Sequence, residues 1–212
     1  MSEDTEIKIC GLSTPETLDA AIAAGATHVG LVHYEPSPRH VSLEDAVKLR
    51  RRVPPSVKVV LLLVNMEAQP TALALEAVRP DVIQFHGSET PEWLALIKNN
   101  TSLEVWKAWG VRNAESLANA LKYKDSVHKM LYDAPAQKLP GGTGTAIDWS
   151  IMEGFRHQIP WGLAGGLSPT NVAEAVARTG APLVDASSGL ESAPGVKDVD
   201  LIAEFCKAAR EA

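Results

Sequence analysis

The sequence predicts a single (β/α)8 TIM barrel, in which parallel strands are surrounded by helices. Segments typical of strands and of helices alternate along the chain, and about eight such units follow one another roughly 22 to 32 residues apart, a short but usual spacing for this fold. No linker or change of composition divides the 212 residues, so we expect one domain, residues 1–212. Glycine loops that suit a phosphate follow the last two strands. In a doubly wound open sheet, the main alternative, they would follow the first strand.

The predicted strands are short apolar stretches that end in glycine or in polar residues. In residues 6–11, apolar and polar side chains alternate as in a strand. Residues 58–64 are a nearly continuous run of β-branched residues and leucine, which is typical of a strand buried on both faces. The others are residues 28–33, 81–87, 103–110 and 129–133, and the two runs that begin at Trp161 and Pro182.

The predicted helices lie between these strands. The first begins with Thr14 as its cap and Pro15 at its first position, and it ends at Gly25. Ser168 is expected to cap the helix at residues 171–178 in the same way. The other predicted helices are residues 42–52, 70–78, 90–99, 114–121, 148–155 and 198–210, the last with an apolar stripe at Val199, Ile202, Ala203, Phe205 and Cys206.

Two strand ends late in the chain predict a phosphate site. Gly165 and Gly166 lie between an apolar run and a helix, so free backbone N–H groups and the positive end of the helix face whatever lies in front. Ser187, Ser188 and Gly189 follow the next strand. One such loop alone is as readily only a tight turn. The pair, in this order, favours phosphate binding.

Candidate catalytic residues lie at the carboxyl ends of the strands, where the chemistry of such barrels takes place. Cys10 and Asp133 end two strands and offer a base and an acid, the minimum for a proton-transfer isomerisation. Helix N-termini around the mouth are expected to lower the pKa of a thiol there, although a lone cysteine is often a small core residue. Arg39 is expected to clamp a carboxylate, or else to lie exposed on its loop. No metal-ligand spacing surrounds His86, for which polar packing is expected rather than metal binding.

The composition limits the partners and the compartment. The net charge of −6 is scattered along the chain, which argues against nucleic acid or an anionic membrane surface as a partner. No stretch is long enough to span a membrane, and the polar, acidic residues 1–6 do not form a secretory signal peptide. Cys10 and Cys206 share no metal or redox spacing. We therefore expect a cytoplasmic protein in a reducing compartment.

The motifs on these strand ends resemble those of the phosphoribosylanthranilate isomerase family. The resemblance covers essentially the whole chain in the right order. It rests on residues 8–11, 37–39, 84–87, 141–144, 163–167, 185–189 and 194–198.

The resemblance implies a (β/α)8 barrel that catalyses an Amadori rearrangement in tryptophan biosynthesis without a metal or an organic cofactor. It implies that Cys10 is the general base and Asp133 the general acid. It also implies that Arg39 lies near the carboxylate of anthranilate, that the glycine loops hold the phosphate of a small phosphosugar, and that the chain is a monomer or a homodimer. The predicted substrate-binding residues are Arg39, Gln84, His86, Gly144, Gly165, Gly166, Asp185, Ser187, Ser188 and Gly189.

The sequence departs from the family pattern at four positions, namely His33, Trp109, Tyr132 and Ala186. We expect them at the mouth or in the layer below it, where they would alter the shape of the pocket more than the type of reaction.

Three other functions are open. The related isomerase of histidine biosynthesis is expected to use two carboxylates, against which Cys10 argues. A different phosphate-binding barrel enzyme, such as a synthase of the same pathway, would need a lysine-rich mouth, which the sequence does not show. A non-catalytic phosphosugar-binding barrel would keep the pocket and lose the chemistry, but both Cys10 and Asp133 are present.

Overall fold

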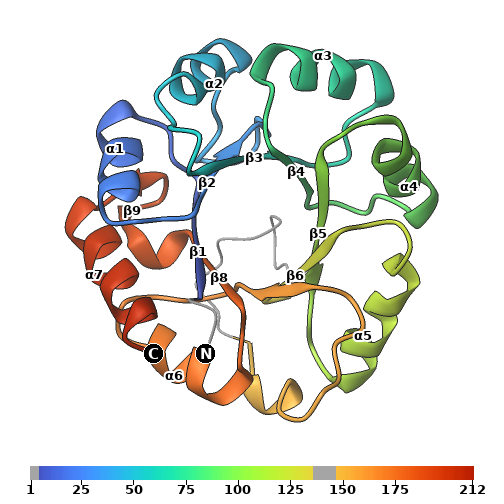
Figure 1. Ribbon diagram of the computed structural model, residues 1–212, viewed down its shortest axis with the longest axis vertical. Helices are drawn as coiled ribbons and strands as arrows, with labels where there is room; N and C mark the ends of the chain where they lie inside the picture. Colours follow the sequence, from blue (N-terminus) through green and yellow to red (C-terminus); the bar gives the residue numbers. More distant parts are fainter. Residues whose placement is uncertain (1–4, 136–146) are drawn as a thin grey trace.

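Eight parallel strands close into a barrel in chain order, and the last strand pairs with the first. The computed structural model describes residues 5–135 and 147–212. Figure 1 looks down the barrel, with the strands around the middle and the helices outside them. The predicted (β/α)8 fold is therefore confirmed. The strands are β1 Glu6–Cys10, β2 His28–Val32, β3 Lys58–Leu63, β4 Val82–Phe85, β5 Glu104–Gly110, β6 Lys129–Asp133, β7 Trp161–Leu163 and β8 Leu183–Ala186.

Most of the helices begin at a residue whose side chain caps them. The side chains of Thr14, Ser42 and Thr90 each accept a hydrogen bond from a backbone N–H of the first turn. Within the described ranges, no helix is both long and apolar enough to cross a membrane. The helices are α1 Pro15–Ala23, α2 Leu43–Arg50, α3 Ala68–Val78, α4 Pro91–Asn100, α5 Ala114–Ala118, α6 Val172–Thr179 and α7 Val199–Arg210.

Two of the expected helices differ from the prediction in type or length. The helix expected at residues 148–155 is only a 3-10 turn, Trp149–Ile151, because the Asp148 side chain binds Ser150 and Gly154 adopts a positive φ of 74°. The helix expected at residues 114–121 changes to a 3-10 helix, Asn119–Tyr123, after α5.

A short antiparallel hairpin precedes α7 and was not predicted. Its strands are β9 Glu191–Ala193 and β10 Val196–Lys197. Strands of two and three residues are too short to show an alternating pattern, so the sequence carries no signal for them.

Alternation along β1 explains how the barrel separates its core from its site. Ile7 and Ile9 belong to the large apolar core between the strands and the helices. Lys8 and Cys10 face the other way, into the barrel, because successive side chains of a strand point to opposite faces. A smaller apolar cluster fills the barrel below the site, formed by Val60, Val82, Trp106, Ala108, Leu131, Ala164 and Leu183.

Candidate active site

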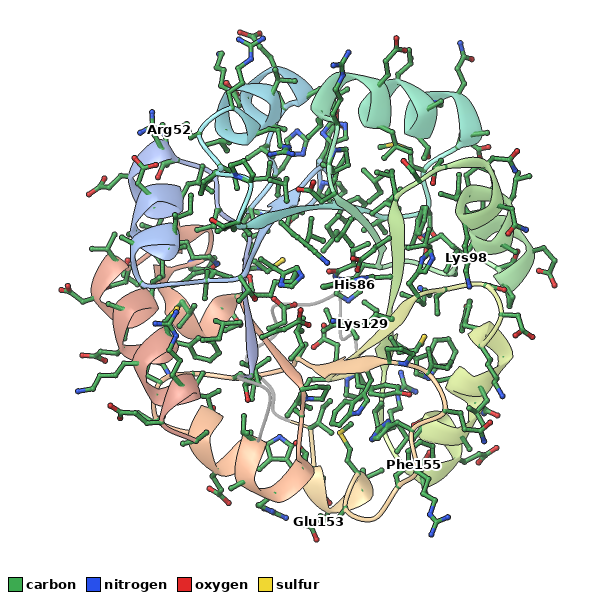
Figure 2. All side chains as sticks on the ribbon, in the orientation of Figure 1. Arg52, His86, Lys98, Lys129, Glu153 and Phe155 are labelled. Carbon is green, nitrogen blue, oxygen red and sulfur yellow. The ribbon has the colours of Figure 1, made fainter. Side chains whose placement is uncertain are left out.

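A cavity opens at the carboxyl ends of the strands and holds about 670 Å³ of empty space, its open mouth included. Figure 2 shows His86 inside the ring of strands, whereas Arg52, Lys98 and Glu153 lie around the outside. Most of the predicted site residues line this cavity, namely Cys10, Arg39, Gln84, His86, Asp133, Gly165, Gly166, Asp185, Ser187 and Ser188. Gly144 lies outside the described residues.

The cavity also has walls that sequence reasoning missed. Tyr34 and Ser37 lie on the same loop as Arg39. Ser37 belongs to the motif at residues 37–39, in which only Arg39 is a predicted site residue. The apolar wall consists of Val32, Leu62, Val64 and Leu167. An apolar wall beside a polar cluster is the usual composition of a small-molecule site.

Cys10 lies at the end of β1 and is 5% exposed. Burial raises the pKa of its thiol above the ordinary value, while the nearby ammonium groups of Lys8 and Lys197 act in the opposite direction. Among the charged groups around the thiol, Lys8 and Lys197 are the ones that favour the thiolate. The pKa lowering expected from helix N-termini stays a prediction.

Asp133 ends β6 and is held at both carboxylate oxygens. Oδ1 accepts a hydrogen bond from the Ala134 N–H at 2.7 Å, and Oδ2 lies 3.2 Å from His86 Nε2. His86 thus contacts the candidate acid directly. In the described part of the chain, no three His, Cys, Asp or Glu side chains gather in a way that could hold a metal ion.

Asp185 forms a buried ion pair beneath Cys10. Its Oδ2 is 2.9 Å from Lys8 Nζ, and the lysine side chain is fully buried. Burial lowers the pKa of Lys8, but the charges and hydrogen bonds of Asp185 and Cys10 together outweigh this effect, and the pKa of the lysine stays above its ordinary value. Among the described residues, Asp185 Oδ1 and Gln84 Oε1 are buried acceptors without a donor. Such oxygens suit the hydroxyl groups of a sugar.

The first glycine loop follows β7. Gly165 and Gly166 have positive φ angles of 83° and 65°, and a Cβ at Gly165 would lie 2.5 Å from the Ala134 nitrogen. The predicted cap, Ser168, is wrong: α6 begins three residues later, after Asn171. The Asn171 side chain instead binds back to the loop, since its Nδ2 donates to the Gly166 carbonyl at 2.9 Å and its Oδ1 accepts from the Ser168 N–H at 2.8 Å.

The second loop, after β8, lies against the first. A Cβ at Gly189 would lie 2.1 Å from the Leu167 carbonyl oxygen, so only glycine allows the two loops to approach this closely. Lys197, in the β9–β10 hairpin, donates to the Ser187 carbonyl at 3.0 Å and to its Oγ at 3.3 Å. Gly189 therefore supports the site by bringing the loops together, although it does not itself line the cavity.

Arg39 lines the cavity and is partly buried. Its guanidinium is already bound to another residue of the protein. Its Nε and Nη2 donate to the two oxygens of Glu191 at 2.8 and 2.7 Å. The hydrogen bond to Glu191 raises the pKa of Arg39 despite its burial. The exposed-loop alternative is wrong. The clamp on a substrate carboxylate stays a prediction, and it is limited to the edge of the guanidinium that Glu191 leaves open.

The four departures from the family pattern lie outside the cavity lining. Tyr132 and Ala186 pack in the core between strands and helices, contrary to the expectation that they shape the pocket. Trp109 donates from Nε1 to the Ser116 carbonyl at 2.7 Å and borders a neighbouring cavity. His33 contacts the Val41 carbonyl through Nδ1, and its ring lies 5.2 Å from the tilted ring of His40.

A cavity with polar side chains at the carboxyl ends of eight parallel strands is typical of the (β/α)8-barrel enzymes. The fold and the cavity place the chain in this class. A family model described as N-(5'phosphoribosyl)anthranilate (PRA) isomerase matches residues 7–208, and the chain belongs to this family.

Relatives and solved structures agree. The N-(5'-phosphoribosyl)anthranilate isomerase of Erythrobacter litoralis is 59% identical over 208 residues, which are 98% of this chain and all of the relative. That of Parvibaculum lavamentivorans is 46% identical over 98% of this chain and 99% of the relative. The crystal structure of the Thermotoga maritima enzyme has a TM-score of 0.90 at 34% identity, with 98% of this chain and all of that chain covered. A phosphoribosyl anthranilate isomerase in complex with reduced 1-(o-carboxyphenylamino)-1-deoxyribulose 5-phosphate has a TM-score of 0.87 at 33% identity over the same shares.

Proposed function

We propose that the chain isomerises N-(5-phosphoribosyl)anthranilate to 1-(2-carboxyphenylamino)-1-deoxyribulose 5-phosphate, the third step from chorismate in tryptophan biosynthesis. The observation that carries this proposal is that Cys10 of β1 and Asp133 of β6 line one cavity together with two glycine loops. The rearrangement needs a base and an acid at different atoms of the sugar. It also needs a remote group by which the substrate is held in register.

Each proton in the proposed mechanism has a defined source. Asp133, as the carboxylic acid, donates a proton to the ribose ring oxygen, and the bond from this oxygen to C1 breaks to give a Schiff base. Cys10, as the thiolate, then removes the proton from C2, which gives an enolamine. The enolamine then becomes the ketone: C1 gains the proton that the Cys10 thiol gives up, and the proton of the 2-hydroxyl returns to the Asp133 carboxylate. Both groups are then in their starting states, and substrate and product are isomers.

The chemistry of the lining supports a small phosphosugar as the partner. The backbone N–H groups of the two glycine loops suit the phosphate, and the positive N-terminal end of α6 lies beside them. The buried oxygens Gln84 Oε1 and Asp185 Oδ1 suit sugar hydroxyls. The remaining edge of Arg39 suits the carboxylate of anthranilate.

The test combines growth with kinetics. The chain is expected to restore growth of a tryptophan auxotroph that lacks this isomerase, and not of a histidine auxotroph that lacks the related one. Cys10→Ala and Asp133→Asn should each lower kcat at least about a hundredfold, because general acid–base catalysis typically contributes 10²- to 10⁴-fold. Ligand affinity should change little.

The chain offers a matched control for each variant. Cys206→Ala removes the other cysteine, which is buried in α7 away from the cavity, and Asp148→Asn changes an exposed cap. Both controls should keep the parent's kcat. If Cys10→Ala turns over like the parent, the thiol is core packing and the mechanism is wrong. A parent that binds the product analogue but never turns over would identify a non-catalytic phosphosugar-binding barrel.

A further inference from the structure

Glu191 is the centre of a buried charge network beside the cavity. Its carboxylate accepts hydrogen bonds from Arg39, from Lys197 Nζ and from the Gly195 N–H. The side chains of Arg39, Glu191 and Lys197 are only 12%, 4% and 1% exposed. Desolvation would raise the pKa of Glu191, but its hydrogen bonds to Arg39 and Lys197 outweigh this and lower the pKa to about 2. The carboxylate is therefore charged at neutral pH and fully used within the protein.

Lys197 has no hydrogen left for a ligand. An ammonium group has three donors, and those of Lys197 point to Glu191 Oε1, to the Ser187 carbonyl and to Ser187 Oγ. Lys197 can therefore affect a bound phosphate only through Ser187. This distinguishes it from a lysine that binds the anion itself.

The contact with the Ser187 carbonyl orients a neighbouring amide. The described peptide bonds are all trans, so the C=O of Ser187 and the N–H of Ser188 point in opposite directions. The carbonyl is directed to Lys197, and the Leu190 N–H also binds it at 3.1 Å. The N–H of Ser188, a cavity-lining residue, is thereby turned away from Lys197 and from the Leu190 N–H.

Glu191 sets the orientation of Arg39 in the same way. A guanidinium has five N–H donors, of which Glu191 takes one on Nε and one on Nη2. Three hydrogens remain, and two of them, one on Nη1 and one on Nη2, lie on the same edge. These two can bind a second carboxylate side by side, and the plane of that contact is fixed by the contact with Glu191.

We propose that Glu191 and Lys197 are positioning residues that fix the phosphate-binding amide of Ser188 and the carboxylate-binding edge of Arg39 relative to each other. The inference rests on the proposed function, because it assigns the two groups to the two ends of that substrate. One buried carboxylate then sets the distance between both recognition elements. Neither Glu191 nor Lys197 touches the substrate.

The test measures binding of two probes without turnover. Inorganic phosphate and anthranilate are titrated separately into the parent, Lys197→Met, Lys197→Arg and Glu191→Gln, and melting temperatures are recorded. Lys129→Met is the matched control, since Lys129 is also partly buried in an ion pair, with Glu6, where β6 and β1 begin.

Lys197→Met should lower the affinity for phosphate about tenfold or more, which is the order of magnitude for a hydrogen bond to a charged group. Its affinity for anthranilate should fall no more than about twofold. Glu191→Gln should weaken both probes. Lys197→Arg should recover part of the phosphate affinity, and Lys129→Met should bind both probes like the parent. The amide resonance of Ser188 should shift when phosphate is added to the parent and lose this response in Lys197→Met.

Folded Lys197→Met with phosphate affinity within twofold of the parent would overturn the proposal. So would an equal loss for both probes together with a lower melting temperature, which a purely structural hairpin predicts. If Lys197→Met does not fold, the double variant Glu191→Gln, Lys197→Met, which removes both charges, takes its place. It should weaken both probes, and a folded double variant with phosphate affinity within twofold of the parent would overturn the proposal. A parent that binds phosphate at Ser188 but does not isomerise would refute the proposed activity and leave this inference standing.

Discussion

The buried ion pair between Lys8 and Asp185 gives a prediction for both stability and catalysis. The two side chains meet at 2.9 Å with 0% and 8% of their surface exposed. Lys8→Met keeps an apolar stem of similar length but leaves the Asp185 carboxylate buried without its partner. Removing one member of such a pair typically costs about 3–5 kcal/mol of unfolding free energy.

The expected change is large enough for simple assays. For a protein of this size, each kcal/mol corresponds to a shift of roughly 2–4 °C in melting temperature, so Lys8→Met should melt about 6–20 °C below the parent. Calorimetry or thermal unfolding followed by circular dichroism measures this. Lys48→Met is the control, because Lys48 forms its ion pairs on the exposed face of α2 and such pairs contribute little.

A second substitution separates the lost ion pair from lost packing. Asp185→Leu in the Lys8→Met background removes both charges and should recover most of the stability, because an apolar pair can replace a buried ion pair. It should not recover activity. The same Lys8→Met variant loses a charge that favours the Cys10 thiolate, so the acidic limb of its kcat/KM profile should move to higher pH. Melting within about 2 °C of the parent, with an unchanged pH profile, would refute this reasoning.

Three further predictions follow from the site and the core. Arg39→Ala should weaken anthranilate far more than inorganic phosphate, by about 1.5–3 kcal/mol in a titration, since it removes a charge-assisted contact; equal losses would count against the assignment. Gly166→Asp places a carboxylate in the phosphate loop and should raise KM strongly in a folded protein. An unchanged KM would show that this loop does not bind the phosphate. Burial lowers the pKa of His28 to about 4, so the unfolded chain takes up a proton that the folded one does not. The stability that His28 contributes should be full above pH 6.5 and fall by about 1.4 kcal/mol per pH unit towards pH 4, and His28→Gln should reduce this slope in urea titrations at several pH values.

Much of the fold could be predicted because its signals are local. Thr14 and Ser42 cap their helices through hydrogen bonds to residues three positions on, and a sequence shows such pairs directly. The prediction that Ser168 caps α6 failed for an equally local reason. Asn171, another good capping residue, binds the Ser168 N–H and the Gly166 carbonyl, and the choice between two such residues depends on the geometry of the glycine loop.

The site could be predicted only as far as strand ends determine it. Cys10, Asp133 and Asp185 share one cavity because parallel strands present their carboxyl ends on the same side. Glu191 and Lys197 carry no such signal. Glu191 lies 152 positions from Arg39 along the chain, and the two meet only through the hairpin, whose strands are too short to predict.

The charge of the site could not be predicted from the charge of the chain. The net charge of −6 argues against nucleic acid or an anionic membrane surface as a partner, yet the two buried clusters beside Cys10 contain three cations, Lys8, Arg39 and Lys197, against two carboxylates. Burial keeps these charges from being screened, so their local excess acts on whatever enters the cavity. A thiolate at Cys10 would balance that excess, and so would an anionic ligand. The same residues that favour the thiolate can therefore attract a substrate with a carboxylate and a phosphate, although the net charge of the chain is negative.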